Sequence, residues 1–229
     1  MRNSLLAIWV TQAEQNTQAL VLPDGCRDLI YKARSGEKPF WFVSDLENES
    51  CTVPINKGDY LKGFRLKPGV KISKQNLLSA MEELDPDNDS VLNRLDRYTG
   101  LTPSVEEALN CLASGVDSVA QAARLLGVSA RTLQRLIQEA TGKPPVFWHR
   151  LARVRKAGRA LNCEGEKATS LAELAFDRGF SDQAHMSREF RTWFGISPSN
   201  LRVEVSDDVS SDTTSDISGA DQLFALGYA

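Results

Sequence analysis

The sequence predicts an α+β protein with a small N-terminal antiparallel β domain. An all-α C-terminal domain follows, with two helix-turn-helix motifs joined by a linker helix. Three observations support this prediction. Short apolar runs broken by turn residues fill residues 1–78, helical spacing replaces them afterwards, and one helix–Gly–helix pattern occurs twice within residues 117–202. A chain of 229 residues is long enough for two such domains.

The first 78 residues contain short apolar runs separated by Gly- and Pro-containing turns, for example Pro-Asp-Gly at 23–25 and Lys-Pro-Gly at 67–69. The runs cover residues 5–10, 19–22, 28–31, 40–43, 51–55, 60–66 and 70–72. Runs of this length and spacing are typical of antiparallel strands, so we expect a small barrel or sandwich.

Residues 79–103 are expected to form a helical linker, because apolar residues recur there at helical spacing and Pro103 suits the first turn of the next helix. Asp85, Asp87 and Asp89 stand at positions 1, 3 and 5 of a calcium-loop pattern. Ser90 and Asp96 replace the Gly and Glu that such a loop needs at positions 6 and 12. An acidic interdomain turn is therefore preferred over a calcium site.

The first copy of the repeated pattern spans residues 117–142 and turns at Gly127. Helical spacing directs its apolar residues inward and leaves Arg131, Gln134 and Arg135 outside on the second helix. Gly can adopt the positive φ that a steep turn between two helices requires.

The second copy spans residues 170–195 and turns at Gly179. Met186, Phe190 and Phe194 form the expected inner face of its second helix. The side chains left outside are Gln183, Ala184, His185, Arg188 and Arg191.

A linker helix over residues 145–161 is expected between the copies, with Trp148, Leu151, Val154, Ala157 and Leu161 inside. Its basic residues are expected mostly outside: Arg150, Arg153, Arg155, Lys156 and Arg159. A single stiff helix would fix the distance between the copies. Reading two successive major grooves on one face of DNA requires recognition helices about 34 Å apart.

Charge is distributed unevenly along the chain. The whole chain has a net charge of −3, but residues 117–202 carry 14 Lys or Arg against 8 Asp or Glu. Residues 1–116 have a net charge of −3 and residues 203–229 a net charge of −6. The basic segment coincides with the repeat, which indicates a nucleic-acid partner for that part of the chain.

Residues 104–202 resemble the DNA-binding domain of AraC/XylS-family transcription regulators. The resemblance is carried by Gly142-x-Pro-Pro145-x-x-Trp148, Arg153-Val-x-x-Ala157-x-x-Ala-Leu161, Ala175-x-x-x-Gly179-Phe180-Ser181, Phe190, Phe194-Gly195-x-Ser197-Pro198 and Arg202. Leu201 departs from the family, which usually has Tyr there. The likeness implies transcription regulation by sequence-specific binding of double-stranded promoter DNA in the cytoplasm.

Carried over by position, the resemblance implies that each second helix enters a major groove. Arg131, Gln134 and Arg135 would read one groove, and Gln183, Ala184, His185 and Arg188 the next. Arg can form a bidentate hydrogen bond with guanine, and Gln can form one with adenine. Phosphate contacts are expected from Ser129, Arg150, Arg153, Ser181 and Arg191. Because the His side chain titrates near neutral pH, the presence of His185 predicts that the DNA affinity of the second unit varies around pH ~6.5.

The N-terminal part is expected to be a reduced form of the family's cupin-like sensor, serving effector sensing, dimerisation or both. An unidentified small-molecule effector and RNA polymerase are further candidate partners, and a homodimer is considered. The alternative is an N-terminal domain that only recruits a protein partner. A third hypothesis is an interaction protein whose helix-turn-helix units have lost DNA binding.

No enzyme activity, cofactor, metal or membrane partner is expected. Both histidines, His149 and His185, lie outside the N-terminal part, so a His-based metal site there is disfavoured. The four cysteines are widely spaced and are interpreted as reduced structural thiols, with a redox-sensitive Cys26 as the less favoured alternative. Residues 203–229 are expected to be an acidic, disordered tail.

Overall fold

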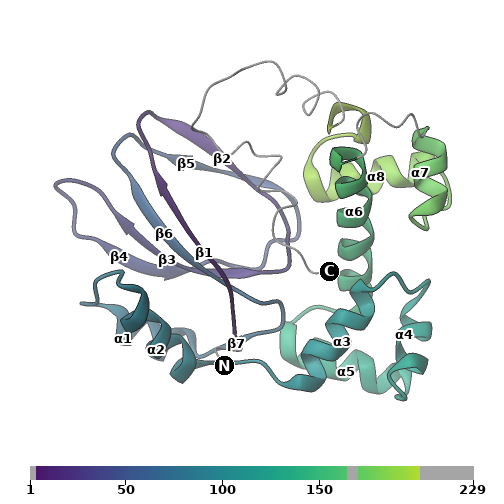
Figure 1. Cartoon of the computed structure of the whole chain (residues 1–229), viewed down its shortest axis with the longest axis horizontal. Helices are drawn as coiled ribbons and strands as arrows, with labels where there is room; N and C mark the ends of the chain where they lie inside the picture. Colours follow the sequence, from purple (N-terminus) through teal and green to yellow (C-terminus); the bar gives the residue numbers. More distant parts are fainter. Residues whose placement is uncertain (1–3, 164–169, 202–229) are drawn as a thin grey trace.

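The computed structural model describes residues 4–163 and 170–201 (Figure 1). Strands and two helices form one half of the molecule, and the remaining helices form the other half, so the predicted α+β class is confirmed. The expected acidic tail lies outside the described residues. No helix in the described ranges is both long and apolar enough to cross a bilayer.

The larger sheet has four antiparallel strands in the spatial order β1-β6-β3-β4. Their bounds are Leu5–Gln12 (β1), Arg27–Ala33 (β3), Phe40–Val43 (β4) and Tyr60–Leu66 (β6). A separate antiparallel ribbon pairs β2 (Thr17–Val21) with β5 (Cys51–Ile55). All seven predicted apolar runs contain a strand, and the described strands do not close into one continuous barrel.

Successive side chains of a strand point to opposite faces of the sheet. In the larger sheet, one of these faces is apolar. Leu29 lies opposite both Phe64 and Val43, and all three side chains are buried. Helices α1 (Lys74–Met81) and α2 (Asn88–Tyr98) lie against this side of the sheet in Figure 1 and complete the core. The predicted helical connection therefore packs on the sheet and belongs to its core.

Polar contacts attach the loop between these helices to the sheet. The Trp41 indole N–H donates to the Leu84 carbonyl at 3.0 Å, and Lys62 Nζ donates to the Pro86 carbonyl at 2.7 Å. In the calcium-loop-like segment, the Asp87 carboxylate accepts the Ser90 N–H at 2.9 Å and caps α2. That hydrogen bond lowers the pKa of Asp87, which accords with an acidic turn.

In the described part of the chain, helices α3 to α8 form the other half of the molecule. They are α3 (Pro103–Ala113), α4 (Val119–Leu125), α5 (Ala130–Thr141), α6 (Pro145–Cys163), α7 (Leu171–Asp177) and α8 (Gln183–Phe194). A two-residue ladder of β7 (Lys71–Ile72) and β8 (Thr99–Gly100) precedes α3. The sequence did not predict β8, because two residues are too few to show a strand period.

Helix α6 is the long element of this half, and at 19 residues it spans about 28 Å. In Figure 1, α3, α4 and α5 gather at one end of α6, and α7 and α8 gather at the other. Trp148, Leu151, Val154, Ala157 and Leu161 are all buried, as the helical spacing predicts.

The β half contacts α6 and the ends of both α5 and α8. Arg155 donates to the Asp24 carbonyl at 2.8 Å, and Gly25 lies against the Trp148 ring. Lys143 pairs with Asn48, and Ser50 lies beside Gly195. The two halves therefore meet along the linker helix and at the end of each helical unit.

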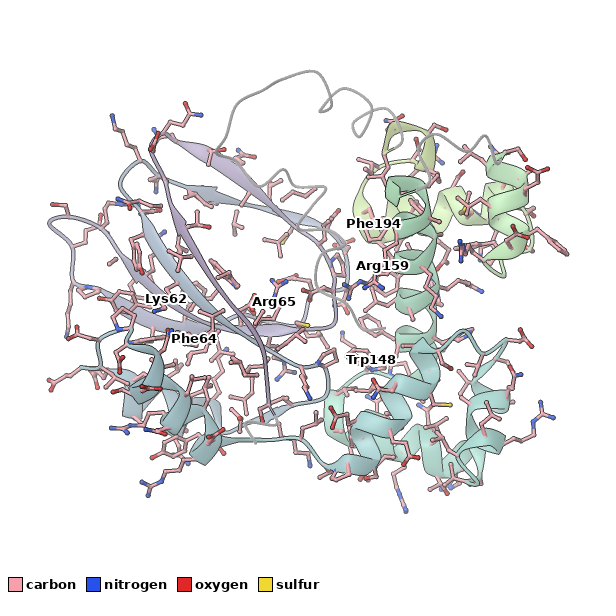
Figure 2. The ribbon with its side chains drawn as sticks, in the orientation of Figure 1. Lys62, Phe64, Arg65, Trp148, Arg159 and Phe194 are labelled. Atoms are coloured by element: carbon pink, nitrogen blue, oxygen red, sulfur yellow. The ribbon has the colours of Figure 1, made fainter. Side chains whose placement is uncertain are left out.

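A small cavity of about 50 Å³ remains where the halves meet. Asp24 and Pro68 line it from the β half, and Trp148, Arg155 and Lys156 line it from α6. Arg65 in the sheet, which pairs with Asp24, and Trp148 and Arg159 on α6 mark this junction in Figure 2. Cys26 is buried beside it as a free thiol, and burial raises the pKa of that thiol well above its ordinary value. A thiol that stays protonated suits a structural role.

Gly25→Ala is expected to weaken the contact between the halves. Gly25 has φ +80°, and a Cβ there would lie 2.6 Å from the Trp148 ring. Gly36 has φ +83° with open space around it, so Gly36→Ala is a matched control for the backbone cost alone. We expect Gly36→Ala to lower the free energy of unfolding by about 1–2 kcal/mol. Gly25→Ala should lower it by about 1–3 kcal/mol more, and urea unfolding measures both changes. Equal losses would contradict tight packing at Trp148.

Candidate nucleic-acid interface

The first helix-turn-helix unit is built from α4 and α5. Ser118 caps α4 through the Gln121 N–H, and Gly127 makes the turn with φ +68°. The Ser129 hydroxyl then accepts the Thr132 N–H at 3.0 Å and starts α5. Capping by Ser satisfies backbone donors that a helix start leaves unpaired. The result is a short first helix and an independently capped second helix.

The second unit repeats this construction in α7 and α8. Ser170 and Glu173 form a reciprocal capping box, and Gly179 makes the turn with φ +74°. The Phe180 N–H donates to the Ala175 carbonyl at 2.9 Å. The Val128 N–H makes the equivalent bond to the Ala123 carbonyl in the first unit at 3.0 Å. The two turns therefore share one backbone geometry.

The second helix of each unit ends at a glycine in the left-handed conformation, Gly142 with φ +73° and Gly195 with φ +73°. On α5, Leu133 and Ile137 are buried, while Arg131, Gln134 and Arg135 are exposed. The exposed positions are those that the repeat predicted, and they lie in the N-terminal half of α5.

On α8, Gln183, Ala184, Arg188 and Arg191 are exposed, as predicted. His185 differs because it is only partly exposed. Its Nδ1 accepts the Ser181 N–H at 3.3 Å and lies 3.0 Å from the Ser181 hydroxyl. His185 therefore packs along the turn, with Ser181 as its hydrogen-bond partner.

Asp182 caps α8 by accepting the His185 N–H at 2.6 Å, and this bond lowers the pKa of Asp182. The charge of Asp182 therefore persists at the positive end of the α8 dipole. A helix start that is already capped by a carboxylate is a poor site for a further phosphate. The exposed side chains, not the backbone N–H groups, form the accessible surface of this helix start.

Several basic side chains of helix α6 bond other parts of the protein. Arg150 pairs with Glu189 through two nitrogens at 3.1 and 2.8 Å. Arg153 donates to the Gly179 carbonyl at 3.1 Å, and its guanidinium lies 4.8 Å from the centre of the Phe180 ring. The five basic residues from Arg150 to Arg159 are all only partly exposed. The expectation that they lie mostly outside is met only in part: none of the five is buried, but each is partly covered, because the second unit and the β half pack against both flanks of α6.

Residues 122–204 match the family model described as a helix-turn-helix domain. The chain is 33% identical over 122 residues to the HTH-type transcriptional regulator GlxA of Rhizobium meliloti, covering 53% of this chain and 36% of GlxA. It is 28% identical over 169 residues to the HTH-type transcriptional activator RhaS of Escherichia coli, covering 63% of this chain and 59% of RhaS. The chain thus spans less than two thirds of each of these relatives.

Among solved structures, an AraC-type regulator from Chromobacterium violaceum is similar over 45% of this chain and 93% of its own, with 26% identity and a TM-score of 0.41. The matched segment, the two HTH-type regulator relatives and the paired turns all indicate a helix-turn-helix domain. Residues 122–204 form an AraC-type helix-turn-helix domain.

Two residues of the AraC-type domain that matter structurally were not identified from sequence. Glu189 is buried on α8 and is the partner of Arg150. Trp193 is also buried and donates its indole N–H to Glu189 Oε2 at 3.3 Å. The available signal was an acidic residue placed between the inward-facing Met186 and Trp193 at helical spacing. A carboxylate in such a position requires a cationic partner.

The Arg150–Glu189 pair is expected to stabilise the AraC-type domain above acidic pH. Burial alone would raise the pKa of Glu189, but hydrogen bonds and the charge of Arg150 outweigh burial and lower it below the ordinary 4.5. The stabilisation is therefore present above about pH 4.5 and is lost as the pH falls through the lower folded pKa. Glu189→Gln should cost about 1–2 kcal/mol at pH 7.

Chemical unfolding of wild type and Glu189→Gln from pH 3 to pH 8 measures this difference. Glu139→Gln, which removes an exposed acid from α5, is the control and should leave stability unchanged. A wild-type advantage that persists undiminished at the acid end would contradict the pairing.

Proposed function

We propose that this protein is a sequence-specific DNA-binding transcription regulator of the AraC/XylS type. The observation that carries the proposal is the pair of equivalent capped second helices, α5 and α8. Each exposes basic and amide side chains at its N-terminal half, the part of such a helix that reads base edges. The whole protein's activity is part of the proposal, because the chain matches only part of GlxA and RhaS.

Base contacts are proposed for the exposed residues of both helices. On α5 these are Arg131, Gln134 and Arg135. On α8 they are Gln183 and Arg188, with the small Ala184 leaving room for an apolar base contact. His185 is proposed as a residue that shapes the α8 start through Ser181 and contacts a base only at its exposed edge.

Phosphate contacts are proposed for Ser129, Ser181 and Arg191, which are exposed. Arg150 and Arg153 are reassigned from phosphate contacts to structural residues, because their guanidinium groups already bond Glu189 and the Gly179 carbonyl. The DNA surface of this protein is therefore smaller than the basic residues of its sequence indicate.

The N-terminal part, with α1 and α2 counted in it, is proposed to modulate DNA binding. Its loops touch α6 and the ends of α5 and α8, so a ligand or partner that moves them would change the DNA-binding half. A small-molecule effector is the favoured modulator, and a protein partner such as RNA polymerase or a second copy is the alternative. We propose no catalytic activity or cofactor, and a cytoplasmic location follows from the proposed DNA target.

Selection of bound fragments from genomic DNA by the full-length protein tests the proposed function. We expect enrichment of fragments that share two short motifs about one duplex turn apart. Affinity should fall steeply with salt, as phosphate neutralisation requires. Absence of any enriched fragment at low salt would reject the proposal in favour of an interaction protein. Thermal shift against a metabolite collection separates an effector-binding N-terminal part from one that only recruits a protein.

Arg188→Ala tests the assigned role of α8. If Arg188 contacts a base, the substitution costs about 1–3 kcal/mol at one base position and relaxes specificity there. Arg124→Ala is a matched control, because Arg124 is equally exposed but lies on α4, the first helix of its unit. Binding of both variants to a panel of single-base site variants is the measurement. An equal loss on every site would identify Arg188 as a phosphate contact instead.

A further inference from the structure

Glu189 lies on the inward side of α8, at the point where α8 crosses α6. Its side chain is 10% exposed, whereas that of Arg150 is 42% exposed. Arg150 binds it with both Nε and Nη2, and the Trp193 indole N–H contributes a third hydrogen bond. A two-pronged pair of this kind fixes orientation as well as distance. The contact therefore constrains the angle at which α8 crosses α6.

The same region of α6 also holds α5. The Trp148 indole N–H donates to Thr141 Oγ1 at 3.1 Å, and Thr141 Oγ1 donates to the Ile137 carbonyl at 2.8 Å. Both Trp148 and Thr141 are buried. The last turn of α5 is thereby attached to the first turn of α6.

Aromatic packing connects these two attachments. The Phe147 ring lies 5.4 Å from Trp148 and 5.1 Å from Trp193, both edge-on. The Arg150 guanidinium lies 5.9 Å from the centre of the Trp193 ring. From α5 to α8, the connection runs through Thr141, Trp148, Phe147, Trp193 and Glu189. Interiors packed in this way transmit displacement instead of absorbing it.

We propose that Glu189, held by Arg150, is a positioning residue that fixes the separation and relative rotation of the two recognition helices, and so determines which half-site spacing the protein accepts. The inference rests on the proposed DNA-binding function and names a specificity determinant that does not touch DNA. A change of one base pair between half-sites moves the second by about 3.4 Å and rotates it by roughly 34–36°. A rigid junction must distort to follow, whereas a loosened junction follows more readily.

The experiment uses the full-length protein and duplexes that carry the selected site with its native spacing, one base pair more, or one base pair fewer. A fourth duplex carries only the half-site bound by α8. We expect wild type to lose at least about tenfold in affinity on either altered spacing, since a mismatch typically costs about 1–3 kcal/mol. Glu189→Gln should lose no more than about threefold on the same duplexes, while binding the single half-site like wild type.

Three controls separate positioning from loss of fold or charge. Glu139→Gln removes the same charge from α5 at an exposed position and should keep the wild-type spacing penalty. Arg150→Met should also reduce the spacing penalty, and the double variant should be no worse than Arg150→Met, because Arg150→Met alone leaves the Glu189 carboxylate buried without that partner. Arg150→Lys retains the positive charge but cannot form the bidentate hydrogen bond, so we expect a spacing penalty between those of wild type and Glu189→Gln.

Each outcome decides the inference. A full spacing penalty in folded Glu189→Gln overturns it, as does an equal loss on all four duplexes, which would mean that Glu189 only supports the α8 fold. If Glu189→Gln does not fold, Arg150→Lys supplies the same comparison. If wild type binds no specific duplex, the proposed function itself is rejected. This result differs from a failure of the inference, which requires a wild-type protein that binds DNA and variants that keep its spacing penalty.

Discussion

The burial of helix α6 is the constraint on which the rest of the structure depends. A single helix of 19 residues cannot bury its apolar stripe alone, so it must recruit neighbours on several sides. Trp148, Leu151 and Val154 are covered because α3, α5 and α8 all pack on α6. Without that helix, the two helix-turn-helix units would be separate small bodies, each with too little core to remain folded by itself.

Helix α6 also redistributes charge. The positive excess of residues 117–202 suggests a broadly basic surface, yet the arginines of α6 bond Glu189, the Gly179 carbonyl and the Asp24 carbonyl. These contacts orient the helices, and the carboxylate of Glu189 also offsets the charge of Arg150 in the field that a distant phosphate would meet. The exposed cations of α5 and α8 are then the residues that distinguish a binding face from the remaining surface.

The β half touches the helical half at the linker helix and at the end of each helix-turn-helix unit. Its loops lie against α6 through Asp24 and Gly25 and reach the ends of α5 and α8 through Asn48 and Ser50. Under the proposed modulation, a change in these loops would reach α6 directly, without any long internal pathway. The contacts between the two halves are a few backbone and side-chain contacts around a small cavity.

The sequence by itself determined the local structure. Gly127 and Gly179 place the turns, Ser129 and Ser170 start helices, and the strands of the β half follow from runs between turn residues, because each of these signals acts over a few residues. It also determined which residues of α5 and α8 face outward, apart from the partly covered His185, since amphipathic spacing decides that. Only the tertiary structure decided which charges are paired. Arg150 and Glu189 are 39 residues apart, and no local pattern reports a partner on another helix. Packing of α8 across α6 brings them together, so Arg150, which was predicted as a phosphate contact, pairs with a buried carboxylate.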